Sequence, residues 1–478
     1  MKPRYLVPTL LAALFTLARL PAADAPAPST DTLPTEWIDP DTGHRIVRLS
    51  RDDNTQSLYF HQNPYTPDGT RLVATVPGGI ETINLKTHEI KKVVEGAAPT
   101  QRIDTHDNTP PEQRISHVVM GRKTPTVYYT RGSDVMATNV DTGATRKICT
   151  LPPELFWGAG FTVNADETLL AGSGDAAPGE LGAIGPNWTG NQAIGQRLAV
   201  LVPMVLYTIN LKTGELKKFF RAEKDWLNHV QFSPTDPTLL MYCHEGPWDQ
   251  VDRIWQIRVV GDTYTVQPGD TYEKIAAAHG TYPAMIRYAA GKGTSDLAIG
   301  EKIQLPPGPP RLIHQRTMNQ EIAGHEFWGA DGKYAWYDLQ TPKSQVFWVG
   351  GMNLATGEHL RYSLPKNEWS VHYNVSPDGK LFAGDGGGPN SVARGDNGQW
   401  IYLFTPDPST ASTIQAGDET VKTLAFKAER LANLAKHDYG LEPNVSFTPD
   451  MKWIVFRSNL LGAEHGSQVF AVEIAKAK

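Results

Sequence analysis

Short, mostly apolar runs rich in strand-forming residues, each beginning just after a tight turn with polar residues, recur through most of the chain. The runs at residues 71–76 and 453–456 are examples, and the turns before them lie at residues 66–69 and 448–450. Asp and Gly are common in these turns because they tolerate backbone angles that most residues avoid. Short apolar runs of this composition between turns predict β-strands joined by hairpins.

A second kind of turn, in which Asn is followed three residues later by Thr-Gly, ends several of the later strands. It occurs at residues 139–143, 210–214 and 353–357. Together the two turns mark out seven strand-only units, and repeats of about 40 to 60 residues are typical of propellers with four-stranded blades. The pattern predicts an all-β fold, a seven-bladed β-propeller. A pair of β-sandwiches is the alternative, which the regular repeat disfavours.

One segment breaks the repeat. A strand and a Pro-Gly-Asp turn at residues 264–271 precede two helical runs, at 272–279 and 282–288, and a closing strand at 299–305. This order resembles a LysM domain, a small α+β module. The resemblance implies binding of N-acetylglucosamine-containing glycans such as peptidoglycan or chitin, and a spacer that binds no glycan is the alternative.

The N-terminus is typical of an export signal. Lys2 and Arg4 precede a mostly apolar stretch at residues 5–17, and small residues at 21–23 offer a cleavage site. An uncleaved anchor is the alternative, but Arg19 shortens the apolar stretch and favours cleavage. We expect an exported protein, periplasmic or secreted, with cell-wall association through the LysM domain and no transmembrane span in the mature chain. The predicted order is signal peptide 1–23, linker 24–35, propeller 36–263, LysM domain 264–306 and propeller 307–478.

Bulk charge and cysteine content narrow the class of protein. The formal net charge of -6 argues against a nucleic-acid-binding protein, which would carry a basic face. Cys149 and Cys243 are the only cysteines, and both lie in apolar runs. Two free, buried thiols are therefore favoured over a disulfide, although an oxidising compartment would permit one.

The turns also place a set of polar residues at one level of the fold. Residues five positions before the Pro or Ala of each turn fall near the start of a blade's innermost strand, which lines the central channel. They are Gln62, Gly160, His229, His325, His372 and Asn444. Glu442 lies two residues before Asn444 and so points to the same side of its strand. We expect a metal or acid–base site there, with simple solvation of the channel as the alternative.

Several motifs resemble those of the oligogalacturonate lyase family, in the same order. They are the Cys-His-Glu-Gly-Pro run at 243–247, Arg-Ile-Trp at 253–255, His-Glu-Phe-Trp at 325–328, Gly-Asp-Gly at 384–386 and Ser-Phe-Thr-Pro at 446–449. The motifs cover nearly all of the propeller, and the LysM segment falls between the second and the third. The resemblance implies that His325 is the catalytic base, that Arg253 assists at the acidic sugar and that His372 is a metal ligand. For Arg253, a salt bridge between blades is the alternative.

The family's other metal ligands lie in a Gln-x-x-His-x-His segment, where this chain has Tyr439, Glu442 and Asn444. With His372, Glu442 and Asn444 would form a site of two oxygens and one nitrogen. Such a site suits a divalent ion such as manganese, with calcium as the second candidate.

We expect His229, His244 and Tyr439 to line the substrate cleft, although His244 could instead hold the turn before Pro247. The resemblance implies metal-assisted β-elimination of short, uronate-containing pectic oligosaccharides, giving 4,5-unsaturated products. A neutral histidine has a suitable pKa to remove the C5 proton near neutral pH. The replaced ligand segment keeps two alternatives open: a non-catalytic cell-wall glycan-binding propeller, or a lyase for another acidic glycan.

Overall fold

The computed structural model describes residues 33–96, 110–155, 160–176, 203–292, 295–388 and 399–477, together with residues 195, 199 and 391. The predicted signal peptide and nearly all of the predicted linker lie outside these residues. Among the described residues, no helix has the length and apolar character needed to cross a membrane.

β-Sheets built from consecutive hairpins dominate residues 34–477, as the repeated turns and strand-forming runs predicted. Three four-stranded sheets come first along the chain. They contain β3 (Gln56–Ser57), β4 (Arg71–Val76), β5 (Gly79–Asn84) and β6 (Ile90–Glu95); β7 (Ile115–Met120), β8 (Thr126–Arg131), β9 (Asp134–Asn139) and β10 (Thr145–Thr150); and β11 (Thr162–Val163), β12 (Leu169–Asp175), β13 (Met204–Asn210) and β14 (Leu216–Ala222).

The next sheet contains the LysM insertion. Its strands are β15 (Trp226–Phe232), β16 (Leu239–Glu245), β17 (Ile254–Arg258) and β20 (Arg311–Leu312), so the inserted segment leaves after β17 and the chain returns to pair with it.

An eight-stranded sheet follows. It contains β21 (Ile322–Trp328), β22 (Tyr334–Gln340), β23 (Phe347–Asn353), β24 (His359–Leu364), β25 (Tyr373–Val375), β26 (Phe382–Gly384), β27 (Trp400–Ala416) and β28 (Glu419–Asn433). Its two halves, β21–β24 and β25–β28, are each a meander of antiparallel strands. They are joined because the long strand β28 pairs in parallel with β24.

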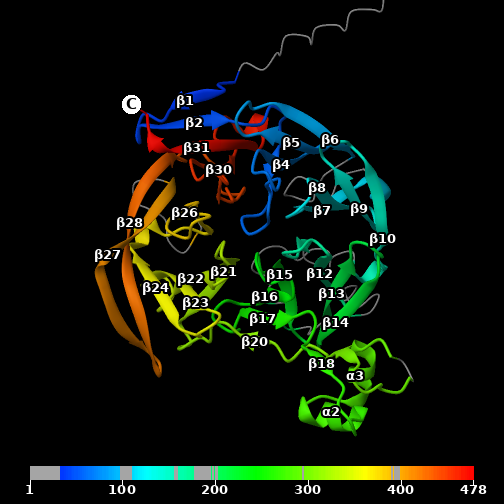
Figure 1. Ribbon diagram of the computed structural model, residues 1–478. Coiled ribbons are helices and arrows are strands. Elements are labelled where there is room, and N and C mark those ends of the chain that lie inside the picture. Colours follow the sequence, from blue (N-terminus) through cyan, green and yellow to red (C-terminus); the bar gives the residue numbers. More distant parts are fainter. Residues whose placement is uncertain are drawn as a thin grey trace, which may run out of the picture. The chain divides into compact units, whose positions relative to one another are not determined.

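The two ends of the described chain share the last sheet. Its strands are β1 (Glu36–Ile38), β2 (His44–Arg48), β29 (Ser446–Phe447), β30 (Trp453–Ser458) and β31 (Gln468–Lys476), and β2 pairs with β31. This pairing closes the fold by backbone hydrogen bonds between segments more than 400 residues apart in the numbering. Figure 1 shows these sheets around a common centre, with first strands such as β7, β15 and β21 on the inner side.

Apolar side chains fill the space between neighbouring sheets. Tyr128 of β8 and Tyr207 of β13 belong to one such cluster, and Ile401 of β27 and Phe470 of β31 belong to another. Each is at most 4% exposed, and burying a large apolar side chain contributes about 1.5–3 kcal/mol. The sheets therefore hold one another by apolar contacts, which leaves the inner strand starts free to carry polar groups.

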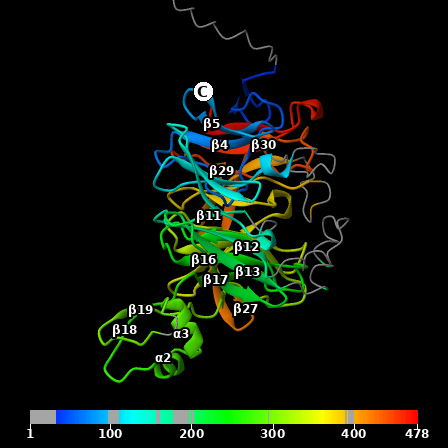
Figure 2. The same ribbon diagram turned by 90° about the vertical axis from the view of Figure 1, so that its right-hand side faces the viewer.

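The inserted segment folds as predicted. Strands β18 (Thr263–Thr265) and β19 (Lys302–Gln304) pair, and the helices α2 (Tyr272–Ala278) and α3 (Pro283–Ala289) lie between them in sequence. Thr271 caps α2 by accepting a hydrogen bond from the backbone N–H of Lys274. The module has its own apolar core, and Figure 2 shows its four elements together.

Candidate functional site

Histidines occupy a distorted position on several inner strands. The strand pairing shifts register between Asn228 and Gln231 of β15 and between Gly324 and Phe327 of β21. His229 and His325 lie within these bulges at φ angles of 45° and 46°, where few residues other than glycine are found. Bulges of this kind redirect side chains and are common beside active sites.

The same distortion recurs elsewhere in the fold. Asn444 has a φ of 54° just before β29, and His117 has a φ of 55° within a shifted pairing of β7 with β8. His117 thus supplies the equivalent residue in the unit whose turn was too irregular to place by sequence. The predicted equivalence of His229, His325 and Asn444 agrees with these backbone angles.

Four histidines gather around one point of the channel. The ring centroids of His325 and His372 lie 4.7 Å apart, those of His229 and His325 lie 6.4 Å apart, and those of His61 and His229 lie 5.5 Å apart. Tyr59 completes the group, with its ring 5.3 Å from that of His372 and 5.5 Å from that of His229. His61 and Tyr59 were missed from the sequence because they follow β3 in an irregular segment.

A buried carboxylate lies behind two of the histidines. Nδ1 of His325 lies 3.4 Å from Oδ1 of Asp338, and Nδ1 of His229 lies 3.2 Å from Oε1 of Glu326. Both acidic side chains are fully buried. Burial lowers the pKa of His229, but Glu326 and Glu245 outweigh it and raise that pKa above its ordinary value. A carboxylate at Nδ1 orients the ring and leaves Nε2 for chemistry.

His372 has the most complete set of partners. Its Nδ1 lies 2.8 Å from Oδ2 of Asp385, which also accepts a hydrogen bond from the backbone N–H of Asn444. Its Nε2 lies 3.2 Å from the hydroxyl of Tyr59 and 3.9 Å from a carboxylate oxygen of Glu442. Burial would lower the pKa of His372, but Asp385 and Glu442 raise it above its ordinary value. His372 and Glu442 therefore meet, as the register predicted.

On the second strand of each sheet, the residue next to the inner-strand histidine can be identified from the strand pairing. Asp338 pairs with the residue before His325, Cys243 pairs with the residue before His229, and Thr130 pairs with the residue before His117. Counting across each hairpin from the inner-strand histidine would have found these partners in the sequence.

Arg253 lies close to this group, and one Nη atom of its guanidinium already has two protein partners. One of its Nη atoms lies 2.6 Å from Oε1 of Glu245 and donates to the carbonyl oxygen of Gly246 at 2.8 Å. Its guanidinium lies 4.9 Å from the ring centroid of Trp248, whose ring in turn lies 4.8 Å from that of His325. The ion pair lies within one sheet and is not the bridge between blades considered as an alternative.

The other predicted residues are placed differently. Asn444 is in the group, but its side-chain oxygen accepts a hydrogen bond from the backbone N–H of Phe60 at 3.3 Å. His244 lies 3.5 Å from Asp225, and because it follows Cys243 on β16 it faces the other side of that strand. Tyr439 has a buried hydroxyl that lacks a hydrogen-bond partner among the described residues.

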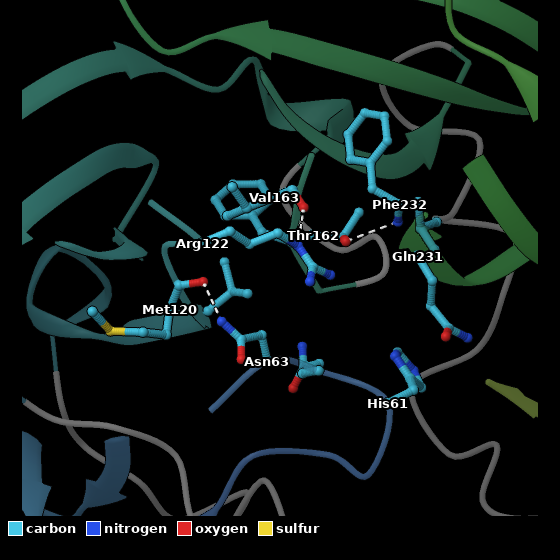
Figure 3. Close-up of a pocket in the computed structure, with 12 residues that line it drawn as sticks. His61, Asn63, Met120, Arg122, Thr162, Val163, Gln231 and Phe232 are labelled. Carbon is cyan, nitrogen blue, oxygen red and sulfur yellow. Dashed lines mark hydrogen bonds between the residues drawn. The ribbon is translucent and has the colours of Figure 1, made fainter. Parts of the chain in front are cut away.

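A small cavity adjoins the histidine group (Figure 3). Segments of four sheets line it, and the side chains of His61, Arg122 and Gln231 take part. Its water-accessible volume of about 10 Å³ corresponds to a single water molecule. Burial lowers the pKa of Arg122 to about 10. A cavity of this size does not hold a sugar ring.

Acidic side chains outnumber arginines around the histidines. The acidic groups are Glu245, Glu326, Asp338, Asp385 and Glu442, and the arginines are Arg253 and Arg457. This leaves an excess of acidic side chains over arginines in a mostly buried place. A bound divalent cation would offset that charge.

Comparison with known proteins agrees with this picture. Residues 33–267 match the family of oligogalacturonate lyases, and residues 264–306 match the LysM domain. An oligogalacturonate lyase of Dickeya dadantii (strain 3937) is 22% identical over 435 residues, which cover 88% of this chain and 92% of that protein.

Two solved structures share the fold. One is an oligogalacturonate lyase in complex with manganese, with a TM-score of 0.63 and 21% identity, covering 92% of this chain and 96% of the other. The second is an oligogalacturonate lyase from Vibrio parahaemolyticus, with a TM-score of 0.65 and 20% identity over the same shares. The family and enzyme class indicated by the motifs, a polysaccharide lyase of this kind with an inserted LysM domain, are confirmed. Residues 33–267 of the chain thus match the oligogalacturonate lyase family, and residues 264–306 match the LysM domain.

Proposed function

We propose that this protein is a metal-assisted lyase that cleaves short, uronate-containing pectic oligosaccharides by β-elimination and leaves 4,5-unsaturated products. The observation that carries the proposal is the group of histidines backed by buried carboxylates at the centre of an oligogalacturonate lyase fold. We also propose that the five smaller propeller sheets and the two halves of the eight-stranded sheet are seven blades.

His325 is the base in this proposal. His325 is 7% exposed, and the Asp338 carboxylate near Nδ1 leaves Nε2 to accept the C5 proton. The proton leaves a carbon next to the uronate carboxylate, and the glycosidic bond at C4 then breaks. A neutral imidazole held at this position can take that proton.

Arg253 and Trp248 support the acidic side of the substrate. Nε of Arg253 is buried and has no hydrogen-bond partner among the described residues. This Nε atom lies 3.2 Å from the position that a Cβ atom on Gly324 would occupy, and Gly324 is the residue before His325. Arg253 thus keeps a donor beside the base, and we assign it to the charge that develops on the uronate carboxylate.

A divalent cation fits the residues on the other side of His325. His372 offers Nε2, and the Glu442 side chain is 41% exposed and lies 3.9 Å away. Asn444 is the third predicted ligand, although its oxygen already accepts one hydrogen bond. A cation held there would spread the negative charge formed as the C5 proton leaves. Oxygen and imidazole donors favour manganese, with calcium as the second candidate.

The LysM domain gives the protein a second kind of partner in this proposal. It would bind peptidoglycan or another N-acetylglucosamine glycan, and it would keep an exported enzyme at the cell wall. The N-terminal pattern of Lys2, Arg4 and a short apolar stretch supports export. A retention assay on peptidoglycan sacculi with and without residues 264–306 tests this part by itself.

The competing function is a glycan-binding propeller without catalysis. It is favoured by one observation: Asn444 stands where the family has a histidine, and its amide serves the backbone. A direct assay separates the two. The lyase reading requires ultraviolet absorbance from an unsaturated product when the protein is given digalacturonate or trigalacturonate with manganese. Binding of these sugars without any absorbance change would support the competing function.

A further inference from the structure

Three metal-binding residue types meet at a junction between two sheets. His229 lies in the bulge of β15, Cys243 lies on the neighbouring strand β16, and Glu326 lies in the bulge of β21 in the next sheet. One nitrogen, the sulfur and one carboxylate oxygen all lie within 4.8 Å of one another. Cys243 and Glu326 are fully buried, whereas the His229 side chain is 13% exposed.

Glu326 is the unusual member of this group. Neither of its carboxylate oxygens accepts a hydrogen bond from any described residue. Nδ1 of His229 lies 3.2 Å from Oε1, but without hydrogen-bond geometry. A buried carboxylate in this state is costly unless a charge or donors compensate it. The guanidinium nearby, that of Arg253, already has Glu245 as its partner at 2.6 Å.

We propose that His229, Cys243 and Glu326 bind a second divalent cation, of the zinc class, separate from the one assigned to His372 and Glu442. Imidazole, thiolate and carboxylate are the donors that zinc takes in proteins, and a thiolate disfavours calcium, magnesium and manganese. On binding, the Cys243 thiol loses its proton to solvent and its sulfur bonds to the metal. The two positive charges of the ion are then balanced by the thiolate and by Glu326.

The position of the site gives it a role beside the proposed base. The ion would link β15 and β16 to β21 next to His325, whose ring lies 6.4 Å from that of His229. His229 is the partly exposed ligand, so the ion would enter the site on its side. A solvent molecule would reach the ion from the same side and complete its coordination. The second ion is therefore a structural clamp for the wall that carries His325.

Cobalt(II) provides a direct test, because a thiolate bound to cobalt gives a near-ultraviolet charge-transfer band. The full chain is stripped with a chelator and titrated with cobalt chloride. We expect a band that saturates by two equivalents of cobalt, the number of cation sites in the proposal, disappears when zinc is added and is absent in Cys243→Ser. Cys149→Ser is the matched control, since Cys149 is the other free cysteine and lies on β10. It should keep the band, as should Glu442→Ala.

Glu326→Gln keeps the thiol and tests the carboxylate. It should weaken zinc binding by more than about 100-fold, beyond the 10–100-fold cost of losing an outer partner of a metal ligand. Circular dichroism checks that each variant is folded. A saturating cobalt titration without a charge-transfer band, or a band lost in Cys149→Ser and kept in Cys243→Ser, would overturn the proposal. Neither result depends on lyase activity.

Discussion

Replacing His325 with Asn isolates its role as the base. Asn removes the imidazole but still tolerates the φ of 46° at this position. Alanine would add a backbone cost of about 1–2 kcal/mol in this region. His117 has a φ of 55° in an equivalent bulge of another sheet. His117→Asn is therefore the matched control.

The expected magnitudes follow from the contacts of each ring. His325 loses ring contacts with Trp248 at 4.8 Å and His372 at 4.7 Å. Aromatic pairs contribute about 0.5–1.5 kcal/mol each, so the loss of these two should destabilise the folded state by roughly 1–3 kcal/mol. His117 loses one such contact, with Phe161 at 5.1 Å, and should lose about half as much. A positioned base contributes about 10²–10⁴-fold in rate, or roughly 3–5 kcal/mol in the barrier.

The assay is the initial rate of ultraviolet absorbance with digalacturonate and manganese, measured with thermal unfolding of the same samples. We expect kcat of His325→Asn to fall by about 10²–10⁴-fold with little change in KM, and kcat of His117→Asn to stay within about twofold of the parent. If His325→Asn is folded and keeps more than about a tenth of the parent kcat, His325 is not the base. An equal loss in both variants would point to a general effect of the bulge.

The remaining predictions concern buried charge and the cation. Asp385→Asn removes the carboxylate that binds Nδ1 of His372 and the backbone N–H of Asn444. Urea unfolding should therefore show a free energy of unfolding lower by about 2–4 kcal/mol, and an unchanged unfolding midpoint would contradict these hydrogen bonds. Burial, with Asp52 nearby, raises the pKa of Glu81 from 4.5 to about 7. The contribution of Glu81 to stability is thus present below pH 4.5 and lost as the pH rises through 7. Glu81→Gln should therefore raise the free energy of unfolding by up to about 3 kcal/mol at pH 8 and leave it unchanged at pH 4.5. The same gain at both pH values would contradict a raised pKa of Glu81. Chelation should abolish lyase activity and manganese should restore it, with Glu442→Ala needing at least about tenfold more metal; full activity in the chelator would count against the cation.

Local signals explain which parts of the fold could be predicted. The strands and their turns were readable because hairpin geometry is set within a few residues, as at residues 66–69 before β4. The LysM module could be predicted from the sequence for the same reason, since Thr271 caps a helix that begins at the next residue. The parallel pairing of β28 with β24 was not foreseen. It depends on two distant segments meeting, which no local pattern encodes.

The site divides in a similar way. His229 and His325 were found because both lie at the same distance before a turn, although the structure places them in bulges midway along β15 and β21 and not at the strand starts that the sequence predicted. Tyr59 and His61 reach the same place from an irregular segment, so their positions depend on how the ring of sheets closes. Glu326 was passed over as part of a family motif, and only its burial without a hydrogen bond draws attention to it.

The central claim is that this protein breaks a uronate linkage by elimination. Mass spectrometry of the products from digalacturonate tests it most directly. Elimination gives two fragments whose masses add up to that of the substrate, one of them unsaturated and absorbing in the ultraviolet, and this is the predicted result. Fragments that together are heavier by one water would mean hydrolysis. Intact substrate in the presence of manganese, from protein shown to be folded, would contradict the proposed function.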